Sequence, residues 1–290
     1  MKSSPKGSTV SRETQLPSPQ QTRTIVIVNQ KGGVGKTTTA VNVASALARG
    51  GLKVLMMDLD PQGNASTALG INHQPGIAGT YEVLLQHAKI ADVQQPSPES
   101  ENLVVVPATI DLAGAEIELV PQVAREQRLR KAVSAHLADS AVDYVIFDCP
   151  PSLGLLTLNA LVAANEILMP IQCEYYALEG VGHLLRTIDL VKDELNPELE
   201  IGTVLLTMFD ARTKLSAQVG EQVRQYFPDQ TLVTLIPRSV RLSEAPSYGQ
   251  TILGYDPQSV GAKAYRRAAE EIAQRGARLS VEAATVGATR

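Results

Sequence analysis

A glycine-rich loop between an apolar run and a helical segment is the feature that most constrains the fold of this chain. The loop reads Gln30-Lys31-Gly32-Gly33-Val34-Gly35-Lys36-Thr37-Thr38. It follows TIVIVN (24–29), an apolar and β-branched run typical of a buried parallel strand. After it, TTTAVNVASALARGG (37–51) has apolar residues at helical spacing and ends in two glycines, which favour a helix terminus. Strand, turn and helix in this order predict the opening unit of an α/β fold.

The rest of the chain repeats this alternation. Further strands are predicted at 53–60, 103–108, 143–151, 166–172, 201–208 and 231–238, and helices around 111–138, 154–164, 179–195, 214–227 and 259–278. This order predicts an α/β fold with a doubly wound, mostly parallel sheet and helices on both faces. We expect a single domain at 23–278. A disordered tail rich in Ser, Pro, Gln and Thr is predicted at 1–22, and a flexible carboxyl terminus at 279–290.

Composition restricts the class of protein. Hydrophobic residues make up 44% of the 290 residues, which is enough for a substantial core. No apolar run approaches the roughly 20 residues of a membrane helix, and the amino terminus lacks the apolar stretch of a signal peptide. Two cysteines cannot form a disulfide framework, so Cys149 and Cys173 are interpreted as small core residues. These features predict a cytoplasmic protein without a membrane partner.

The glycine-rich loop has the composition of a phosphate-binding site. Its glycines let the backbone N–H groups point inward around a phosphate, and the helix that begins near Thr37 adds its positive dipole end. Lys36 is placed to reach the β- and γ-phosphates, and the Thr37 hydroxyl is placed to ligate Mg²⁺. The predicted cofactors are ATP and Mg²⁺. The predicted contacts to them are Gly32, Gly33, Val34, Gly35, Lys36, Thr37 and Thr38, and the resemblance described below adds Lys31.

Three aspartates end strands that we expect to lie beside this loop. Asp58 and Asp60 end the second strand in MMDLDPQGN, and Asp148 ends VIFDCPP. The carboxyl ends of parallel strands share one edge of a doubly wound sheet, where ligands bind. Asp148 follows four apolar residues and fits a Walker B aspartate that holds Mg²⁺ through water. Two interpretations of Asp58 remain open, a support for the Mg²⁺ shell and a cap for a neighbouring turn.

The loop departs from the general P-loop pattern in an informative way. The pattern is G-x-x-x-x-G-K-[ST], whereas here Gln30 takes the first glycine position and Lys31 follows it. This resembles the deviant Walker A motif of the ParA/MinD class of ATPases. The resemblance implies an ATP-dependent homodimer in which Lys31 reaches the partner's nucleotide, as an arginine finger does in trans. It also implies that Asp60 orients or deprotonates the attacking water. Lys31, Lys36 and Asp60 are therefore the expected catalytic residues.

Further segments resemble the chromosomal ParA (Soj) branch of this class. They are DLDPQGNAS, DYVIFDCPPSLGLLTLNAL, PIQCEYYALEG, LLTMFDARTKLS and IPRSVRLSEAPSYG, and with the loop they span residue 24 to about 270. The resemblance implies a chromosome or plasmid partition ATPase on the nucleoid. It would bind double-stranded DNA without sequence preference, and a ParB-type centromere-binding partner would stimulate its hydrolysis.

Residue roles follow from the same resemblance. The implied DNA contacts are Arg212 and Arg241, and Pro237 matches a position near the adenine. Weaker candidates for DNA contact are Lys214, Arg238, Lys263, Arg266 and Arg267. The pI of about 5.7 is not that of a typical nucleic-acid binder. Any DNA surface must therefore be a local basic patch, which dimerisation would double.

Four related functions are weighed against the partition ATPase. A MinD-like membrane ATPase needs a carboxyl-terminal amphipathic helix, but that end is rich in alanine and polar residues. An iron–sulfur reductase ATPase needs cluster cysteines in other motifs. A plasmid-type repressor needs an additional amino-terminal helix-turn-helix domain, for which a 22-residue tail is too short. A biosynthetic ligase or amidase with the same loop is disfavoured by resemblance alone.

Overall fold

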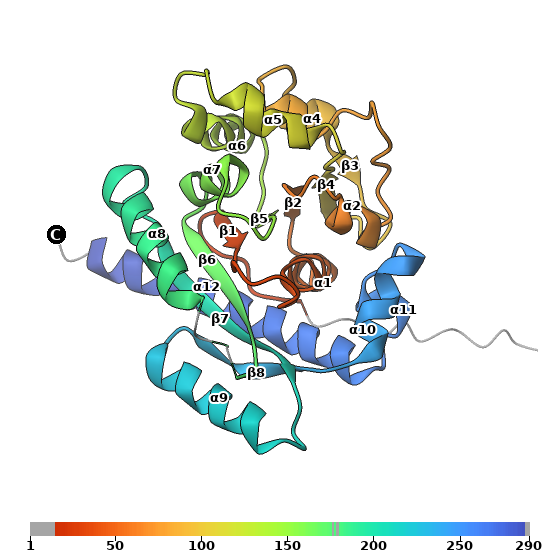
Figure 1. Cartoon of the computed structure of the whole chain (residues 1–290), viewed down its shortest axis with the longest axis vertical. Coiled ribbons are helices and arrows are strands. Elements are labelled where there is room, and N and C mark those ends of the chain that lie inside the picture. The colour runs from red at the N-terminus through yellow and green to blue at the C-terminus, as the bar shows by residue number, and fades with distance from the viewer. Residues whose placement is uncertain (1–14, 176, 178–179, 288–290) are drawn as a thin grey trace, which may run out of the picture.

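The computed structural model describes residues 15–175, 177 and 180–287 and confirms the predicted α/β sheet (Figure 1). The strand order is β3-β4-β2-β5-β1-β6-β7-β8. Every neighbouring pair is parallel except β3 and β4. The strands are β1 (Arg23–Ile27), β2 (Val54–Asp58), β3 (Gln95–Pro96), β4 (Leu103–Val106), β5 (Tyr144–Asp148), β6 (Glu166–Gln172), β7 (Glu200–Phe209) and β8 (Thr231–Pro237).

Helices cover both faces of the sheet because successive side chains of a strand point to opposite sides. Val26 of β1 packs in one apolar cluster with α3 to α9, and Ile25 and Ile27 pack in another with α1, α2 and α10 to α12. The α-helices before β5 are α1 (Lys36–Arg49), α2 (Asn64–Ala68), α3 (Thr80–Leu84), α4 (Ile90–Val93), α5 (Leu112–Leu119) and α6 (Arg128–Asp139). Those after it are α7 (Leu155–Ala163), α8 (Val181–Glu194), α9 (Lys214–Tyr226), α10 (Val240–Glu244), α11 (Ile252–Tyr255) and α12 (Val260–Gly287).

The predicted helix at 111–138 is divided in the structure. It consists of α5, a 3₁₀ turn η1 (Arg125–Gln127) and α6. Pro121 has no N–H to continue α5, and Ala124 has a positive φ of 50°, which no α-helix contains. The last predicted helix, in contrast, is longer than expected, since α12 continues to Gly287. A second 3₁₀ turn, η2 (Ala245–Tyr248), connects α10 to the segment before α11.

The amino-terminal tail predicted at 1–22 is described only from residue 15. The Leu16 backbone N–H donates to the Gly50 carbonyl at 2.9 Å, and the Leu16 side chain packs against the apolar cluster that includes α1. Residues 1–14 lie outside the described part of the chain. Within the described residues, no helix is both long and apolar enough to cross a membrane.

Candidate nucleotide-binding site

The loop that connects β1 to α1 forms an open cradle. Gly33 and Gly35 have φ values of 75° and 88°, a region that residues with a side chain rarely adopt. A Cβ atom placed on either glycine would have no described heavy atom within 4 Å, so the loop encloses free space. The Thr207 hydroxyl donates to the Val34 carbonyl at 2.8 Å, and the Lys31 N–H donates to Asn29 Oδ1 at 3.0 Å. One contact with β7 and one within the connection itself therefore fix the loop without filling it.

Lys36, the first residue of α1, lies among buried acids at this loop. Its side chain is buried, and burial lowers the pKa of its amine, while the carboxylates of Asp148 and Asp60 oppose that change. The Nζ atom donates to the Lys31 carbonyl of the same loop at 3.4 Å. A buried cation at a helix amino terminus is well placed to attract phosphate. This is the position predicted for the lysine that contacts the β- and γ-phosphates.

Asp148 is a buried carboxylate without a hydrogen-bond partner. It ends β5, beside Ile27 of β1 and Asp58 of β2. Its side chain is 0% exposed, and neither oxygen has a partner among the described residues. Burial raises the pKa of Asp148 well above its ordinary range, and the charge of Asp58 raises it further. The nearby Thr37 hydroxyl lowers the pKa of Asp148, although the two groups do not form a hydrogen bond of normal geometry. A cation can stabilise such an orphaned buried acid in place of a proton, and a hydroxyl beside it provides a second oxygen ligand.

The donor set at this position suits Mg²⁺. That ion prefers oxygen ligands and keeps several of its waters, so one hydroxyl, one carboxylate and the phosphates of a nucleotide are sufficient to hold it. Thr37 and Asp148 are the two side chains here that would hold Mg²⁺, directly and through water, as predicted from the sequence. The structure therefore fits the predicted ion by the chemistry of its donors.

Asp58 is occupied by contacts within the protein. Its Oδ2 atom accepts from the backbone N–H and the hydroxyl of Ser66 at 2.8 and 2.7 Å. Its Oδ1 atom accepts from the Asp60 N–H at 3.1 Å. Burial raises the pKa of Asp58 to about 6 in spite of these hydrogen bonds. Of the two interpretations left open by the sequence, these contacts favour the cap of the turn that precedes α2.

Asp60 lies in that turn, at the same edge of the sheet. Its Oδ1 atom accepts from the Gln62 N–H at 3.0 Å, and its carbonyl accepts from the Gly63 N–H at 2.8 Å. Gly63 has a φ of 62°, and a Cβ atom there would lie 2.6 Å from His73 Nδ1. The turn is therefore restricted to glycine at this residue. It holds the buried Asp60 carboxylate beside the loop, where the predicted attack on a phosphate would occur.

A cavity of about 310 Å³ adjoins the loop on the side of β7 and β8. Gly35 and Thr38 line it together with Met208, Pro237 and Leu242. Met208 has a φ of 51°, an uncommon conformation for a residue with a side chain, and such strain is often found at functional sites. The cavity brings Pro237 close to the loop, as the predicted adenine contact requires. The sequence predicted no role for Met208 and Leu242, although both lie in segments that carry the family resemblance, because their place at the cavity depends on the fold.

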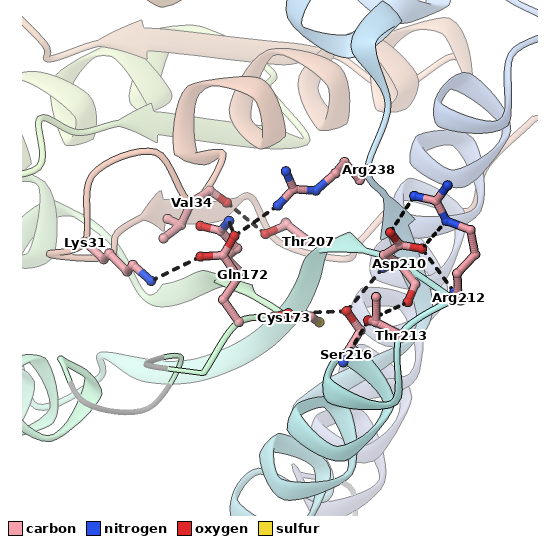
Figure 2. A network of polar contacts seen from close by, with 11 residues as sticks. Lys31, Val34, Gln172, Cys173, Thr207, Asp210, Arg212, Thr213, Ser216 and Arg238 are labelled. Atoms are coloured by element: carbon pink, nitrogen blue, oxygen red, sulfur yellow. Dashed lines mark hydrogen bonds and ion pairs between the residues drawn. The ribbon is translucent and has the colours of Figure 1, made fainter.

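The Lys31 side chain contacts an acid that Lys36 does not contact. Its Nζ atom lies 3.9 Å from Glu174 Oε2, and its side chain is partly exposed (Figure 2). The other oxygen of Glu174 accepts from Arg238 at 3.0 Å. Glu174 therefore lies between two cations at the surface, one from the loop and one that follows β8. Glu174 lies in the segment PIQCEYYALEG, but no role was predicted for it from the sequence.

The two arginines predicted to contact DNA are exposed and paired with acids. Arg212 follows β7 with a side chain that is 87% exposed, and it donates to both oxygens of Asp210 at 2.9 and 2.7 Å (Figure 2). This pair lowers the pKa of Asp210 to about 2. Arg241 of α10 donates to Glu244 and to the Tyr255 hydroxyl, both at 3.4 Å. The structure brings neither arginine into contact with the other, and their role on DNA stays a prediction.

The weaker candidates for DNA contact lie on several elements. Lys214 begins α9, and Arg238 follows β8. Lys263, Arg266 and Arg267 lie on the first turns of α12, where Arg266 donates to the Pro257 carbonyl at 2.7 Å. These residues do not form a single cluster by the contacts described, and their role is also untested.

Comparison with known proteins identifies the family. A family model described as an AAA domain matches residues 22–201. The chain is 54% identical over 252 residues to the sporulation initiation inhibitor protein Soj of Bacillus subtilis, which covers 87% of this chain and 98% of that protein. The chain belongs to the ParA/Soj family. It is also 54% identical to the chromosome partitioning protein ParA of Myxococcus xanthus, over 87% of this chain and 88% of that protein.

Solved structures of related proteins contain nucleotide and metal. A cobyrinic acid a,c-diamide synthase of Mycobacterium smegmatis with bound ADP and magnesium is 39% identical, with a TM-score of 0.74 over 86% of this chain and 93% of that one. MinD of Pyrococcus horikoshii, complexed with Mg-ADP, is 27% identical with a TM-score of 0.70, over 87% of this chain and 96% of that one. This ParA/Soj protein is accordingly an ATPase with ATP and Mg²⁺ as its cofactors.

Proposed function

We propose that this ATPase partitions chromosomal or plasmid DNA as an ATP-dependent homodimer. The dimer binds double-stranded DNA without sequence preference on the nucleoid, and a ParB-type centromere-binding protein stimulates hydrolysis and releases it. The observation that carries the proposal is the position of Lys31. This lysine is partly exposed and lies 3.9 Å from the acid Glu174, whereas Lys36 is buried at the loop. A second, solvent-accessible cation beside the loop is available to a nucleotide held by another copy.

In this proposal each site residue has its own role in ATP hydrolysis. The loop N–H groups and Lys36 bind the phosphates, and Thr37 with Asp148 holds Mg²⁺. When bound, the metal offsets negative charge on the phosphates. Asp60 orients the attacking water or accepts its proton, and Lys31 of the second copy completes the charge stabilisation. Because that lysine arrives only with the second copy, hydrolysis depends on dimerisation.

An exposed apolar surface supports the second copy. Ile110, Ile117, Val120 and Val123 are all more than half exposed, in the segment around α5. This segment begins after β4, whose last residue pairs with Met57 at the nucleotide edge of the sheet. Clustered exposed apolar residues are typical of protein–protein interfaces. Their place beside the site is where a dimer closed around nucleotide would need such a surface.

A small-molecule amide synthase is the second candidate, because a solved relative is named as one. Amide synthesis with glutamine as nitrogen donor commonly uses a reactive thiolate. The two cysteines here are Cys149 and Cys173, which are 1% and 3% exposed. Burial raises the pKa of both thiols, that of Cys173 to about 11. A buried thiol with a raised pKa is a poor nucleophile, which favours partitioning over this alternative.

Binding to random-sequence duplex DNA tests the proposal. The protein is titrated without nucleotide and with ADP, ATP or a slowly hydrolysed ATP analogue. We expect binding only with ATP or the analogue, longer-lived in Asp60→Ala and strongly weakened in Arg241→Ala. Arg186→Ala serves as a matched control, because Arg186 is an exposed arginine of α8 outside the predicted DNA contacts. DNA binding that ignores nucleotide, or that never occurs, would leave the ATPase assignment intact and contradict the partition mechanism.

A further inference from the structure

A cavity between α6 and the segment that contains α3 and α4 takes no part in the nucleotide site. It encloses about 580 Å³, whereas the cavity beside the loop encloses about 310 Å³. Both α3 and α4 pack against α6, and Figure 1 shows α4 and α6 well apart from α1, the helix that follows the loop. Cavities of this size are typical of sites that bind a small molecule.

The body of the cavity is apolar. Val83 of α3 and Ile90 of α4 line it and are each 1% exposed. Ala132 and Ala135 line it from α6, where their short side chains leave space. An apolar group of a ligand can therefore enter between these helices and leave water.

A strained turn forms one wall of the cavity. Gln86 follows α3 and has a φ of 62°, which residues with a side chain rarely adopt. The turn is held by the His87 N–H, which donates to the Glu82 carbonyl at 2.8 Å, and by the Gln86 N–H, which donates to the Val83 carbonyl at 3.1 Å. Backbone strain of this kind is often found at functional sites. The turn also places His87 in the lining of the cavity.

His136 is a buried polar side chain that the protein itself leaves without a partner. It lines the cavity from α6 and is 8% exposed. Its ring nitrogens have no hydrogen-bond partner among the described residues. Burial lowers the pKa of His136, so the ring is neutral at pH 7 and offers one donor and one acceptor. Because buried polar groups are nearly always hydrogen-bonded, this ring suits a polar group of a ligand.

The charged residues that line the cavity are equal in number but differ in their contacts. Lys89 and Lys131 form no ion pair within the described part of the chain. Asp92 accepts from the Lys89 backbone N–H at 3.1 Å. Asp139, at the end of α6, is near enough to His136 to oppose the lowering of its pKa. Two ammonium groups and one carboxylate are thus left without a hydrogen bond or an ion pair.

The other charged residues of α3 and α6 are engaged outside the cavity. Glu82 accepts from the Gly79 N–H at 2.6 Å. Arg128 and Arg130 each donate to a backbone carbonyl at 3.3 Å, and neither lines the cavity. The unpaired charge that faces the cavity is therefore positive on balance.

We propose that this cavity binds a small organic anion. Lys89 and Lys131 bind its carboxylate or phosphate, and Val83 and Ile90 contact its apolar body. His136 forms one hydrogen bond with a polar group of the ligand. The site is distinct from the nucleotide site, because no residue of the phosphate-binding loop lines the cavity. The nucleotide can therefore remain bound while the anion is tested.

Three probes that share one apolar body and differ in charge test the proposal. Phenylacetate is an anion, phenylacetamide is its neutral counterpart, and 2-phenylethylamine is a cation. Each is titrated into the full-length protein with Mg²⁺ and excess ADP, which fills the nucleotide site. The Ile90 methyl signal in ¹H–¹³C NMR spectra, assigned from Ile90→Val, reports binding in the cavity.

Four variants give the residues their roles. Lys89→Met and Lys131→Met remove one charge each, and His136→Leu removes the ring nitrogens. Lys53→Met is the matched control, because Lys53 is an exposed lysine before β2 and does not line the cavity. Circular dichroism and ADP binding establish that each variant is folded. The comparison of the three probes on the wild type needs no variant, so it decides the proposal even where a variant does not fold.

We expect phenylacetate to bind the wild type with a Kd of about 1–10 mM, as a ligand of this size does. The amide and the amine should bind about fivefold more weakly or not at all, because they lack the charge that the lysines attract. Each cavity variant should weaken phenylacetate by about threefold or more, which is the typical effect of losing one hydrogen bond. Lys53→Met should stay within about twofold of the wild type.

The opposite results are equally clear. An Ile90 signal that does not shift at about 50 mM phenylacetate would overturn the site. Equal affinity for phenylacetate and phenylacetamide would overturn the assignment to an anion, and tighter binding of 2-phenylethylamine would assign the cavity to cations through Asp92 and Asp139. Wild-type affinity in folded Lys89→Met and Lys131→Met would also contradict the proposal.

Discussion

At the scale of single residues, Asp148 shows a conflict between stability and function. A buried carboxylate without a hydrogen-bond partner destabilises the fold unless a cation is present. We predict that Asp148→Asn raises the free energy of unfolding of the metal-free, nucleotide-free protein by about 1–3 kcal/mol at neutral pH, because the buried amide is neutral without taking up a proton. Urea denaturation with a chelator measures the change. Asp229→Asn, at an exposed acid, is the control and should leave stability unchanged.

The pH dependence of that gain follows from the direction of the pKa change. The folded protein raises the pKa of Asp148 above its ordinary value of 3.8, so it retains a proton that the unfolded chain has released. Wild-type stability therefore falls as pH rises from about 4 through the raised pKa, and Asp148→Asn lacks this contribution. The gain should be absent near pH 4 and largest at neutral pH. A gain of equal size at both pH values would contradict a charge effect.

The two lysines of the loop make a second prediction at this scale. Lys36→Ala should weaken ATP binding by about tenfold or more, because Lys36 lies buried in the cradle. Lys31→Ala should bind ATP within about threefold of the wild type but fail to form an ATP-dependent dimer. Isothermal titration calorimetry and sedimentation velocity measure the two properties. An equal loss of ATP affinity in both variants would show that Lys31 contacts the nucleotide bound to its own copy.

At the scale of elements, Asn42 connects the helix after the loop to the segment beyond α10. Its Nδ2 donates to the Thr38 carbonyl at 2.7 Å, and its Oδ1 accepts from the Ile252 N–H at 2.9 Å. We predict that Asn42→Leu lowers the free energy of unfolding by about 1–3 kcal/mol, because it leaves the buried Ile252 N–H without a partner. Ser45→Ala is the comparison. The Ser45 hydroxyl donates to Glu99 Oε2 at 3.0 Å, and its loss should cost less, since Glu99 keeps Arg49 and Thr251 as donors. Equal losses in urea denaturation would contradict this difference.

The sequence predicted the elements whose cause is local. The seven long strands and the loop were predictable because apolar periodicity and glycine spacing are properties of neighbouring residues. The edge strand β3 was not, because two residues that pair with β4 leave no periodic pattern. The break between α5 and α6 was also missed, although Pro121 was visible in the sequence. The break also involves the positive φ of Ala124, which the sequence does not show.

The residues of the candidate site also fall into those that the sequence predicted and those that it did not. Lys36, Thr37 and Asp148 belong to motifs, so the sequence predicted that they would meet. Glu174, Met208 and Leu242 lie in segments that carry the family resemblance, but no role was predicted for them, because they reach the site only through the packing of distant segments. The bond between Asn42 and Ile252 joins residues 210 positions apart, and no pattern in one sequence marks such a pair.

At the scale of the whole molecule, a net charge of −4 opposes binding to DNA. The predicted surface must therefore act through local arginines, each of which is paired with an acid in this structure. Exposed ion pairs of this kind contribute little to stability, so a DNA phosphate can replace the carboxylate at small cost. Dimerisation doubles the number of arginines on one duplex. ATP-dependent DNA binding then follows because the dimer makes more phosphate contacts than one copy does. No single contact has to become stronger.

The salt dependence of binding tests this count of contacts. A dimer that places Arg212 and Arg241 of both copies on phosphates should bind DNA with a slope of about −4 in a plot of log K against log salt concentration. Arg241→Ala removes one contact from each copy and should reduce the magnitude of the slope by about two. Arg186→Ala should leave the slope unchanged, because α8 is not expected on the DNA. Fluorescence anisotropy at several salt concentrations with the ATP analogue measures the slopes. An unchanged slope in Arg241→Ala would show that this arginine does not contact DNA. If the wild-type affinity did not depend on salt, contacts to phosphates would not explain DNA binding.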